Sequence, residues 1–172
     1  SIHLTRSIDK IIIVPLLDFT SVGLYQFNLQ ILLGFEMLPI ALHNYLLSEE
    51  SSNQKHKKIE FFALLLSIIV IIIVIFLSPI IIPLLFSEYS DGILGLQIMI
   101  LSLLPLTLGS IFSAKLQANN SKNSGTAVIV KVISFVILLF MLGQFYGIIG
   151  LSIAILTSYV IYALYLGILL KK

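Results

Sequence analysis

The stretch FFALLLSIIVIIIVIFL, residues 61–77, decides the class of fold. It is apolar throughout except for Ser67, and the apolar character continues to Phe86. A helix that spans a membrane needs about 20 predominantly apolar residues, so this segment is long enough to cross a bilayer. It shows none of the period-two alternation that a strand of a membrane barrel has. The sequence therefore predicts a transmembrane helix over 60–86.

The composition of the whole chain agrees with a membrane environment. Of its 172 residues, 59% are hydrophobic and 10% are charged, and the mean hydropathy is +1.12. Soluble domains contain about half apolar and about a quarter charged residues, so most water-soluble folds are excluded. The sequence contains no cysteine, which excludes disulfides, thiol catalysis and thiolate metal sites. The net charge of +2 is too small to indicate nucleic-acid binding.

Polar segments divide the chain into further apolar runs. Because backbone groups find no water inside a bilayer, runs of this length are expected to be helical. We therefore predict an all-α, polytopic transmembrane bundle of about six helices, which forms a single lobe over 1–172. The first helix is expected to be incomplete, because the chain begins at Ser1 within a charged apolar run, as the C-terminal part of a longer protein would. The expected spans are 1–17 (partial), 22–47, 60–86, 93–115, 126–142 and 148–170.

The distribution of lysine predicts the orientation of these spans. If the spans cross the membrane alternately, one side receives loops 48–58 and 115–125 and the C-terminus. The turns on the other side, at 18–23, 87–92 and 143–147, contain no Lys or Arg. Basic residues are enriched in cytoplasmic loops, so the Lys-rich side is expected to be cytoplasmic and the protein to be a multi-pass protein of the cell membrane. The lysines on that side are Lys55, Lys57, Lys58, Lys115, Lys122, Lys171 and Lys172.

Charged residues within the first span are candidates for function, since charges are costly in a bilayer. Arg6, Asp9 and Lys10 have the spacing i, i+3 and i+4, which places them on one face of a helix. Two interpretations stay open. In one, the two cations line a central cavity and attract an anionic group such as a phosphate. In the other, the three residues form a self-satisfied ion cluster that fixes this helix to its neighbours.

A second set of candidates lies on a polar stripe of span 22–47. Glu36 is expected near the middle of the membrane as a titratable group, and it either lines the cavity or pairs with Arg6 or Lys10. His43 is expected to be an interfacial hydrogen-bonding group or a proton relay. At 3.6 residues per turn the stripe falls within about 60° of one direction. Its members are Tyr25, Asn28, Leu32, Glu36, Pro39 and His43.

Other positions indicate packing rather than chemistry. Lys131 is expected to extend its side chain back to the Lys-rich face of the membrane. The four-residue spacing of Gly150, Ala154 and Ser158 predicts close contact between helices. The sequence contains no glycine-rich phosphate loop and no histidine pair with metal spacing. We therefore expect no enzyme, no catalytic residue, no metal site and no cofactor.

Several stretches, in this order, resemble one family. The chain is similar to the C-terminal half of a polysaccharide-type flippase of the multidrug, oligosaccharidyl-lipid and polysaccharide exporter superfamily, and the resemblance covers helices seven to twelve. It implies one lobe of a two-lobe transporter that works by alternating access. The stretches are RSIDKIII (6–13), VGLYQFNLQ (22–30), LPIAL (38–42), IIIPLLFSEYSDG (80–92), AKLQANNSKNSG (114–125) and YGIIGLSIAIL (146–156).

The resemblance implies a function and partners. The expected substrate is a lipid-linked oligosaccharide or polysaccharide precursor that is flipped across the cytoplasmic membrane. The partners are this glycan, the lipid bilayer and an N-terminal lobe that this sequence lacks, without which the chain is not expected to transport. The substrate-binding candidates in the lumen are Arg6, Asp9, Lys10, Tyr25, Asn28 and Glu36.

Three alternatives stay open. A cation-coupled drug antiporter of the same superfamily would depend on acidic residues such as Asp9 and Glu36 rather than on basic ones. A membrane scaffold would use the polar residues only to join helices. The absence of a first lobe also agrees with a partial gene product.

Overall fold

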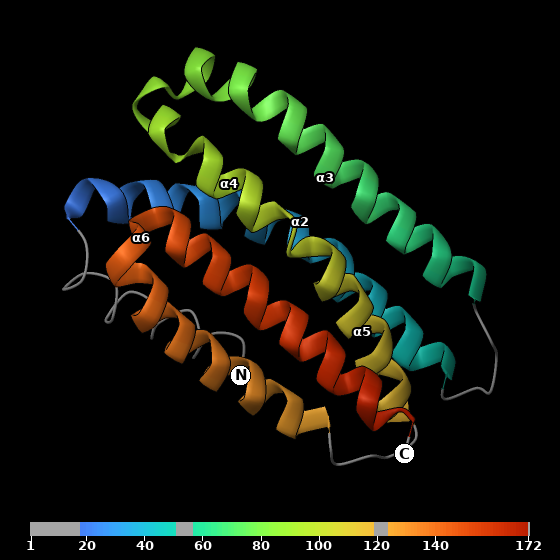
Figure 1. Ribbon diagram of the computed structural model, residues 1–172. Helices are drawn as coiled ribbons and strands as arrows, with labels where there is room; N and C mark the ends of the chain where they lie inside the picture. The colour runs from blue at the N-terminus through green and yellow to red at the C-terminus, as the bar shows by residue number, and fades with distance from the viewer. Residues whose placement is uncertain (1–17, 51–56, 119–123, 172) are drawn as a thin grey trace.

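A computed structural model of the chain describes residues 18–50, 57–118 and 124–171. Within these residues the structure is helical and contains no strand. The helices run back and forth along one long axis (Figure 1). They are α2 (Phe19–Glu50), α3 (Lys57–Leu85), the short 3-10 helix η1 (Ser87–Gly92), α4 (Ile93–Ile100), α5 (Leu103–Ala118) and α6 (Ser124–Leu169).

Four helical stretches among the described residues are long and apolar enough to cross a membrane, against the six predicted spans. Predicted span 1–17 lies outside the described residues. Predicted spans 126–142 and 148–170 both fall within α6, because the helix continues through Gly143 and loses helical geometry only at Gly147. The four stretches are Phe19–Ser48, Lys57–Leu85, Ser87–Ala118 and Gly125–Leu169.

Gly147 divides α6 into two helices without an intervening loop. Its backbone angles, φ 53° and ψ −131°, are accessible to glycine and strained for any residue with a β-carbon. The two parts of α6 then run in opposite directions, as the orange and red ribbons of Figure 1 show. Gly150 allows them to meet, since a β-carbon there would overlap the carbonyl oxygen of Leu142.

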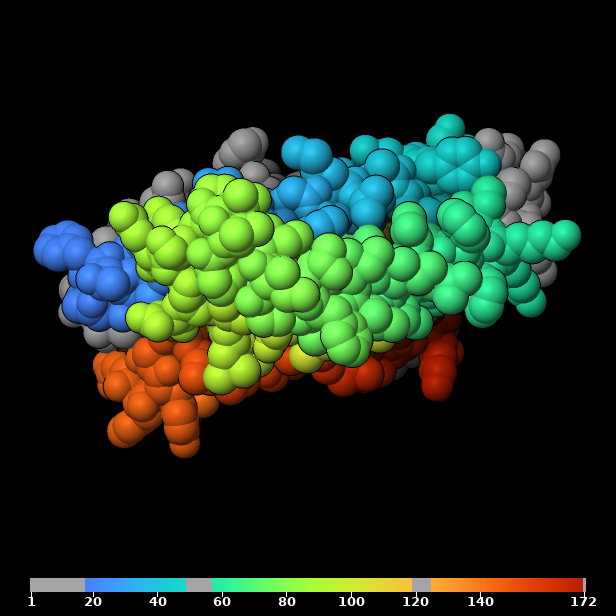
Figure 2. Space-filling view, turned by 90° about the horizontal axis from the view of Figure 1, so that it is seen from above, coloured from blue at the N-terminus to red at the C-terminus, as the bar shows by residue number. Residues whose placement is uncertain are grey.

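The outer helix α3 carries the segment that decided the fold. Its buried residues follow a single stripe with spacings of three and four, which is the face toward the other helices. Beyond Lys57 and Lys58, most of the rest of its surface is exposed and apolar, and Figure 2 shows α3 extending along this side of the molecule. A helix that is apolar all round is suited to lipid on one side and protein on the other. The buried residues are Ser67, Ile71, Val74, Ser78 and Ile82.

Polar contacts fix α3 to its neighbours at three levels. Ser67 Oγ lies 2.7 Å from Thr107 Oγ1, and Lys115 Nζ of α5 lies 2.7 Å from Glu60. Farther along, Gln97 of α4 donates its Nε2–H to the carbonyl oxygen of Ile75 at 3.1 Å. This carbonyl precedes Pro79 by one turn, and proline has no N–H with which to bond it. Gln97 therefore satisfies a backbone group that α3 itself leaves open.

The span predicted over 93–115 is interrupted between α4 and α5. The carbonyl oxygen of Met99 accepts hydrogen bonds from the N–H and the hydroxyl of Ser102, at 3.1 and 2.6 Å, in a tighter turn. Pro105 lies one turn after Leu101 and offers no N–H to its carbonyl. The α-helix is therefore interrupted in the turn before Pro105.

The buried core lies between α2, α4 and both parts of α6. One apolar cluster, almost fully buried, contains Leu32 of α2, Met99 of α4, Leu139 of the first part of α6 and Leu151 of the second.

The ends of the bundle differ in charge. One end of the molecule contains the end of α2, the start of α3, the end of α5 and the start of α6. The other end contains η1 and the turn between the two parts of α6 (Figure 1). The described lysines near helix ends therefore gather at one end of the bundle.

Candidate functional site

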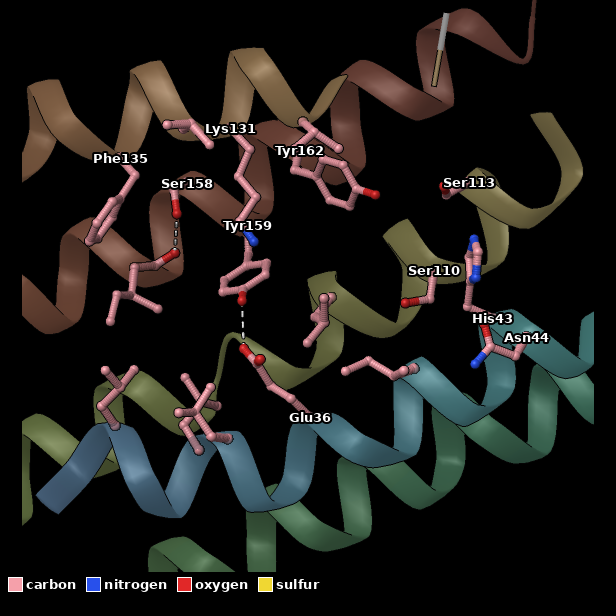
Figure 3. A pocket seen from close by; sticks show the side chains of 18 of the residues that line it. Glu36, His43, Asn44, Ser110, Ser113, Lys131, Phe135, Ser158, Tyr159 and Tyr162 are labelled. Atoms are coloured by element: carbon pink, nitrogen blue, oxygen red, sulfur yellow. Dashed lines mark hydrogen bonds between the residues drawn. The ribbon is translucent and has the colours of Figure 1, made fainter. Parts of the chain in front are cut away.

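A cavity of about 420 Å³ lies between α2, α5 and α6. Figure 3 shows the side chains that reach it from these three helices. Its lining is mainly apolar, with a small set of polar groups, which is the usual composition of a binding site for small molecules. The polar lining residues are Glu36, His43, Asn44, Ser110, Ser113, Gln117, Lys131, Ser158, Tyr159 and Tyr162.

A hydrogen bond crosses the cavity at mid-length. The hydroxyl of Tyr159, from the second part of α6, donates to Oε1 of Glu36 on α2 at 2.5 Å (Figure 3). Only 6% of the surface of Glu36 and 9% of that of Tyr159 are exposed. A buried carboxylate is costly unless it is hydrogen-bonded, and a bond to an ionised acceptor is among the stronger ones. This contact therefore joins two walls of the cavity that lie far apart in the sequence.

Lys131 brings a positive charge to the cavity wall beside Tyr159. Its Nζ lies 3.8 Å from the centre of the Tyr159 ring and 5.8 Å from that of Tyr162. At such distances the ring attracts the cation. The sequence predicted that Lys131 extends toward the membrane face, and in the structure its ammonium lies over Tyr159 in the cavity wall. The electrostatic attraction of the aromatic face stabilises this inward position.

The two ends of the cavity differ in polarity. Toward the Lys-bearing end of the bundle, Gln117 of α5 donates to Ser113 Oγ at 2.8 Å and lies 3.3 Å from Nε2 of His43. Beyond Glu36 and Tyr159, the lining is formed mainly by apolar side chains, and the hydroxyl of Ser158 is bonded to the carbonyl oxygen of Ile155. In Figure 3, His43, Asn44, Ser110 and Ser113 lie on one side of the Glu36–Tyr159 contact, and Ser158 lies with Phe135 on the other. The cavity is therefore amphipathic along its length.

The candidates that the sequence placed on α2 separate into two groups. Glu36 and His43 line the cavity. Asn28 is fully buried near η1, where its Nδ2 donates to the carbonyl oxygen of Gly92 at 2.9 Å. Tyr25 is buried in the apolar core. Their contacts are those of helix packing. The candidates Arg6, Asp9 and Lys10 lie outside the described residues.

Several lining residues were not among the candidates from the sequence. Ser110, Ser113 and Gln117 have spacings of three and four, so a polar face on α5 was detectable in the sequence. Lys131 and Tyr159 carried a weaker signal, because a single lysine or tyrosine in an apolar helix does not reveal which neighbour it meets. Ser158 was assigned to packing, and its bond to Ile155 agrees with that role.

The cavity offers groups that bind and orient rather than groups that hold a metal. Among the described residues, no cluster of His, Asp or Glu side chains has the geometry of a metal site. Serine and tyrosine hydroxyls, an amide, a carboxylate and an ammonium are suited to the polar part of an amphipathic molecule, and the apolar half is suited to its hydrocarbon part. No protein-family model, curated protein or solved structure matches the chain.

Proposed function

We propose that this chain is one lobe of a membrane transporter that moves lipid-linked oligosaccharide or polysaccharide precursors across the cytoplasmic membrane by alternating access. The observation that carries the proposal is the amphipathic cavity between α2, α5 and α6, inside a bundle whose helices are long enough to span a bilayer. Transporters commonly bind their substrates near the bilayer midplane, between elements that move. A second lobe and the lipid bilayer complete the proposed assembly.

The substrate class follows from the lining of the cavity. Lys131 supplies positive charge beside Tyr159, which suits a phosphate group, and serine and tyrosine hydroxyls suit sugar hydroxyls. The apolar half suits a hydrocarbon chain. A volume of about 420 Å³ is that of a small-molecule site, so the cavity accommodates one part of a lipid-linked glycan at a time. In this proposal the Lys-bearing ends of the helices face the cytoplasm.

Flipping by the full-length protein in reconstituted vesicles tests this function. The probe is a polyprenyl-diphosphate-linked oligosaccharide with a fluorescent sugar, and the readout is the rate at which the label becomes accessible to an external quencher. We expect Lys131→Gln to slow flipping about tenfold or more, since hydrogen bonds and contacts to a charged group contribute about 1.5–3 kcal/mol. The matched control is Lys58→Gln, which removes an exposed lysine outside the cavity.

Two results would contradict the proposal. One is a parental flipping rate in both Lys131→Gln and Glu36→Gln. The other is normal flipping after deletion of the protein in cells, together with loss of a partner enzyme from the membrane, which would favour a membrane scaffold.

A second candidate function is a cation-coupled drug antiporter, and the observation that favours it is the buried carboxylate of Glu36 in the cavity wall. A cationic substrate would be attracted to this carboxylate. Efflux of a cationic dye from vesicles with a pH gradient distinguishes the two functions. In an antiporter, Glu36→Gln abolishes efflux of the dye, whereas a glycan flippase transports the dye in neither form.

A further inference from the structure

The contact between Glu36 and Tyr159 occupies a distinctive position in the molecule. It lies where the polar part of the cavity meets the apolar part, and it joins α2 to the second part of α6. By contrast, α3 is fixed to α4 and α5 by contacts at three levels away from the cavity. Separating α2 from α6 would therefore enlarge the cavity without disturbing the attachment of α3.

The strength of this contact depends on the charge of Glu36. A hydroxyl that donates to a carboxylate forms a shorter and roughly twofold stronger hydrogen bond than one that donates to a neutral carboxyl group. The separation of 2.5 Å between Tyr159 Oη and Glu36 Oε1 is in the range of such charge-assisted bonds. Protonation of Glu36 would replace this bond with a weaker one and would remove a negative charge from the cavity wall.

We propose that Glu36 is a proton-binding site and that its ionised form, through Tyr159, holds α2 against α6, so that binding of one proton releases the two helices. The step moves one proton from water to a carboxylate oxygen of Glu36, while Tyr159 keeps its own proton. This proposal rests on the proposed transport function in one respect, because both require the cavity to open. The proton is then a ligand of the same cavity as the substrate.

The surroundings of Glu36 identify the groups that can influence this site. The ionisable side chains among the described lining residues are Glu36 and His43 from α2 and Lys131, Tyr159 and Tyr162 from α6. α5 contributes uncharged polar groups, and Lys115 is paired with Glu60 away from the cavity. His43 is the other ionisable lining residue of α2, so its effect has to be separated from that of Glu36.

A pair of spin labels measures the separation of the two helices without any substrate. The sequence contains no cysteine, so labels can be placed at Ala41→Cys on α2 and Leu164→Cys on α6. Both positions are exposed and neither lines the cavity. The full-length protein, with any cysteine outside residues 1–172 replaced by serine, is measured in lipid nanodiscs between about pH 4 and about pH 9, which includes the ordinary titration range of glutamate. Circular dichroism verifies that every variant is folded.

At high pH we expect one narrow distance distribution, and at low pH a second, longer one. In Glu36→Gln the ratio of long to short distances should rise about tenfold or more at high pH, because a bond to a charged group is lost. It should also become independent of pH. Tyr159→Phe should have the same effect at high pH, because it keeps the ring beneath Lys131 and removes only the hydroxyl. The control Tyr165→Phe removes a hydroxyl of α6 outside the cavity and should match the parent.

Two outcomes would overturn the inference. In the first, Glu36→Gln and Tyr159→Phe both give the parental distances at every pH. In the second, the response to pH persists in Glu36→Gln and disappears in His43→Gln, which would assign the switch to His43 and its contact with Gln117. Because no substrate is present, these outcomes do not depend on what the protein transports.

Discussion

At the scale of single residues, the most informative contact outside the cavity is that of Gln97 with the backbone of α3. Proline at position 79 leaves the carbonyl oxygen of Ile75 without its usual helical donor, and the amide of Gln97 supplies one from another helix. Within a bilayer such a group has no water as an alternative partner. One side chain thus both allows a proline inside a helix that is apolar enough to span a membrane and joins two helices.

The pair Gln97 and Pro79 can be tested by a double-mutant cycle. We expect Gln97→Leu to lower the free energy of unfolding by about 1 kcal/mol, because the carbonyl oxygen of Ile75 loses its partner. In a Pro79→Ala background the same change should cost less, since the backbone at position 79 then offers an N–H to this carbonyl. Denaturant unfolding in detergent micelles measures all four proteins. Equal costs of Gln97→Leu in both backgrounds would contradict this explanation.

At the scale of elements, the start of α2 depends on Asp18. Its Oδ2 accepts the N–H of Ser21 at 3.3 Å, which is the usual contact of a helix N-cap. Hydrogen bonds from the side chain and the backbone of Ser21 lower the pKa of this carboxyl below its ordinary value of 3.8. The folded form thus favours the ionised carboxylate.

The lowered pKa of Asp18 gives a pH dependence with a definite sign. The cap stabilises the start of α2 above pH 3.8, and its contribution is lost as the pH falls below 3.8 through the lower pKa of the folded state. We expect hydrogen exchange at the N–H of Ser21, corrected for the intrinsic effect of pH, to accelerate in that range. Asp18→Asn keeps an oxygen that caps the helix and cannot ionise, so its corrected exchange should not change with pH. If Asp18→Asn showed the same dependence of exchange on pH as the parent protein, the carboxylate of Asp18 would be excluded as its cause.

The reversal of chain direction within α6 depends on the backbone conformation of Gly147. Replacing it by alanine places a β-carbon on a backbone with φ 53°, which costs about 1–3 kcal/mol. We expect Gly147→Ala to lower the thermal unfolding temperature. The matched control is Gly34→Ala on α2, where a β-carbon meets no atom within 4 Å, and the stability should remain equal or rise slightly. Equal effects of the two substitutions would contradict the assigned role of Gly147.

At the scale of the whole molecule, the apolar outer faces and the unequal ends give the chain its proposed orientation. The large exposed side chains are mostly apolar and lie on α2, α3 and α6, which suits contact with lipid. Lys57 and Lys58 lie at one end of the bundle with the end of α5, and η1 with Glu88 and Asp91 lies at the other. An excess of lysine marks cytoplasmic segments.

The orientation can be measured with single cysteines, since the sequence has none of its own. Glu88→Cys and Lys57→Cys place a thiol at opposite ends of the bundle, and both positions are exposed. In intact cells we expect a membrane-impermeant maleimide to label position 88 and to label position 57 only after permeabilisation. Labelling of position 57 in intact cells would reverse the proposed orientation.

The sequence predicted the class of fold because length and apolarity act locally. The run 61–77 is helical in a membrane whatever its neighbours are, and polar segments such as 48–58 mark where a helix ends. The sequence placed a connection at 143–147 between two spans, and the chain reverses at Gly147 within that range. Glu36 was found because its spacing from His43 places both on one face of α2.

The partners of these residues were decided by the tertiary structure alone. Helical periodicity fixes the face that a residue occupies on its own helix, but not the helix that this face will meet. Glu36 and Tyr159 are 123 residues apart, and they meet because the packing of apolar side chains between α2, α4 and α6 sets the register of these helices. The same packing turns Lys131 inward over Tyr159. The sequence by itself therefore determined a bundle of apolar helices with one lysine-rich end, and the packing of that bundle created the cavity.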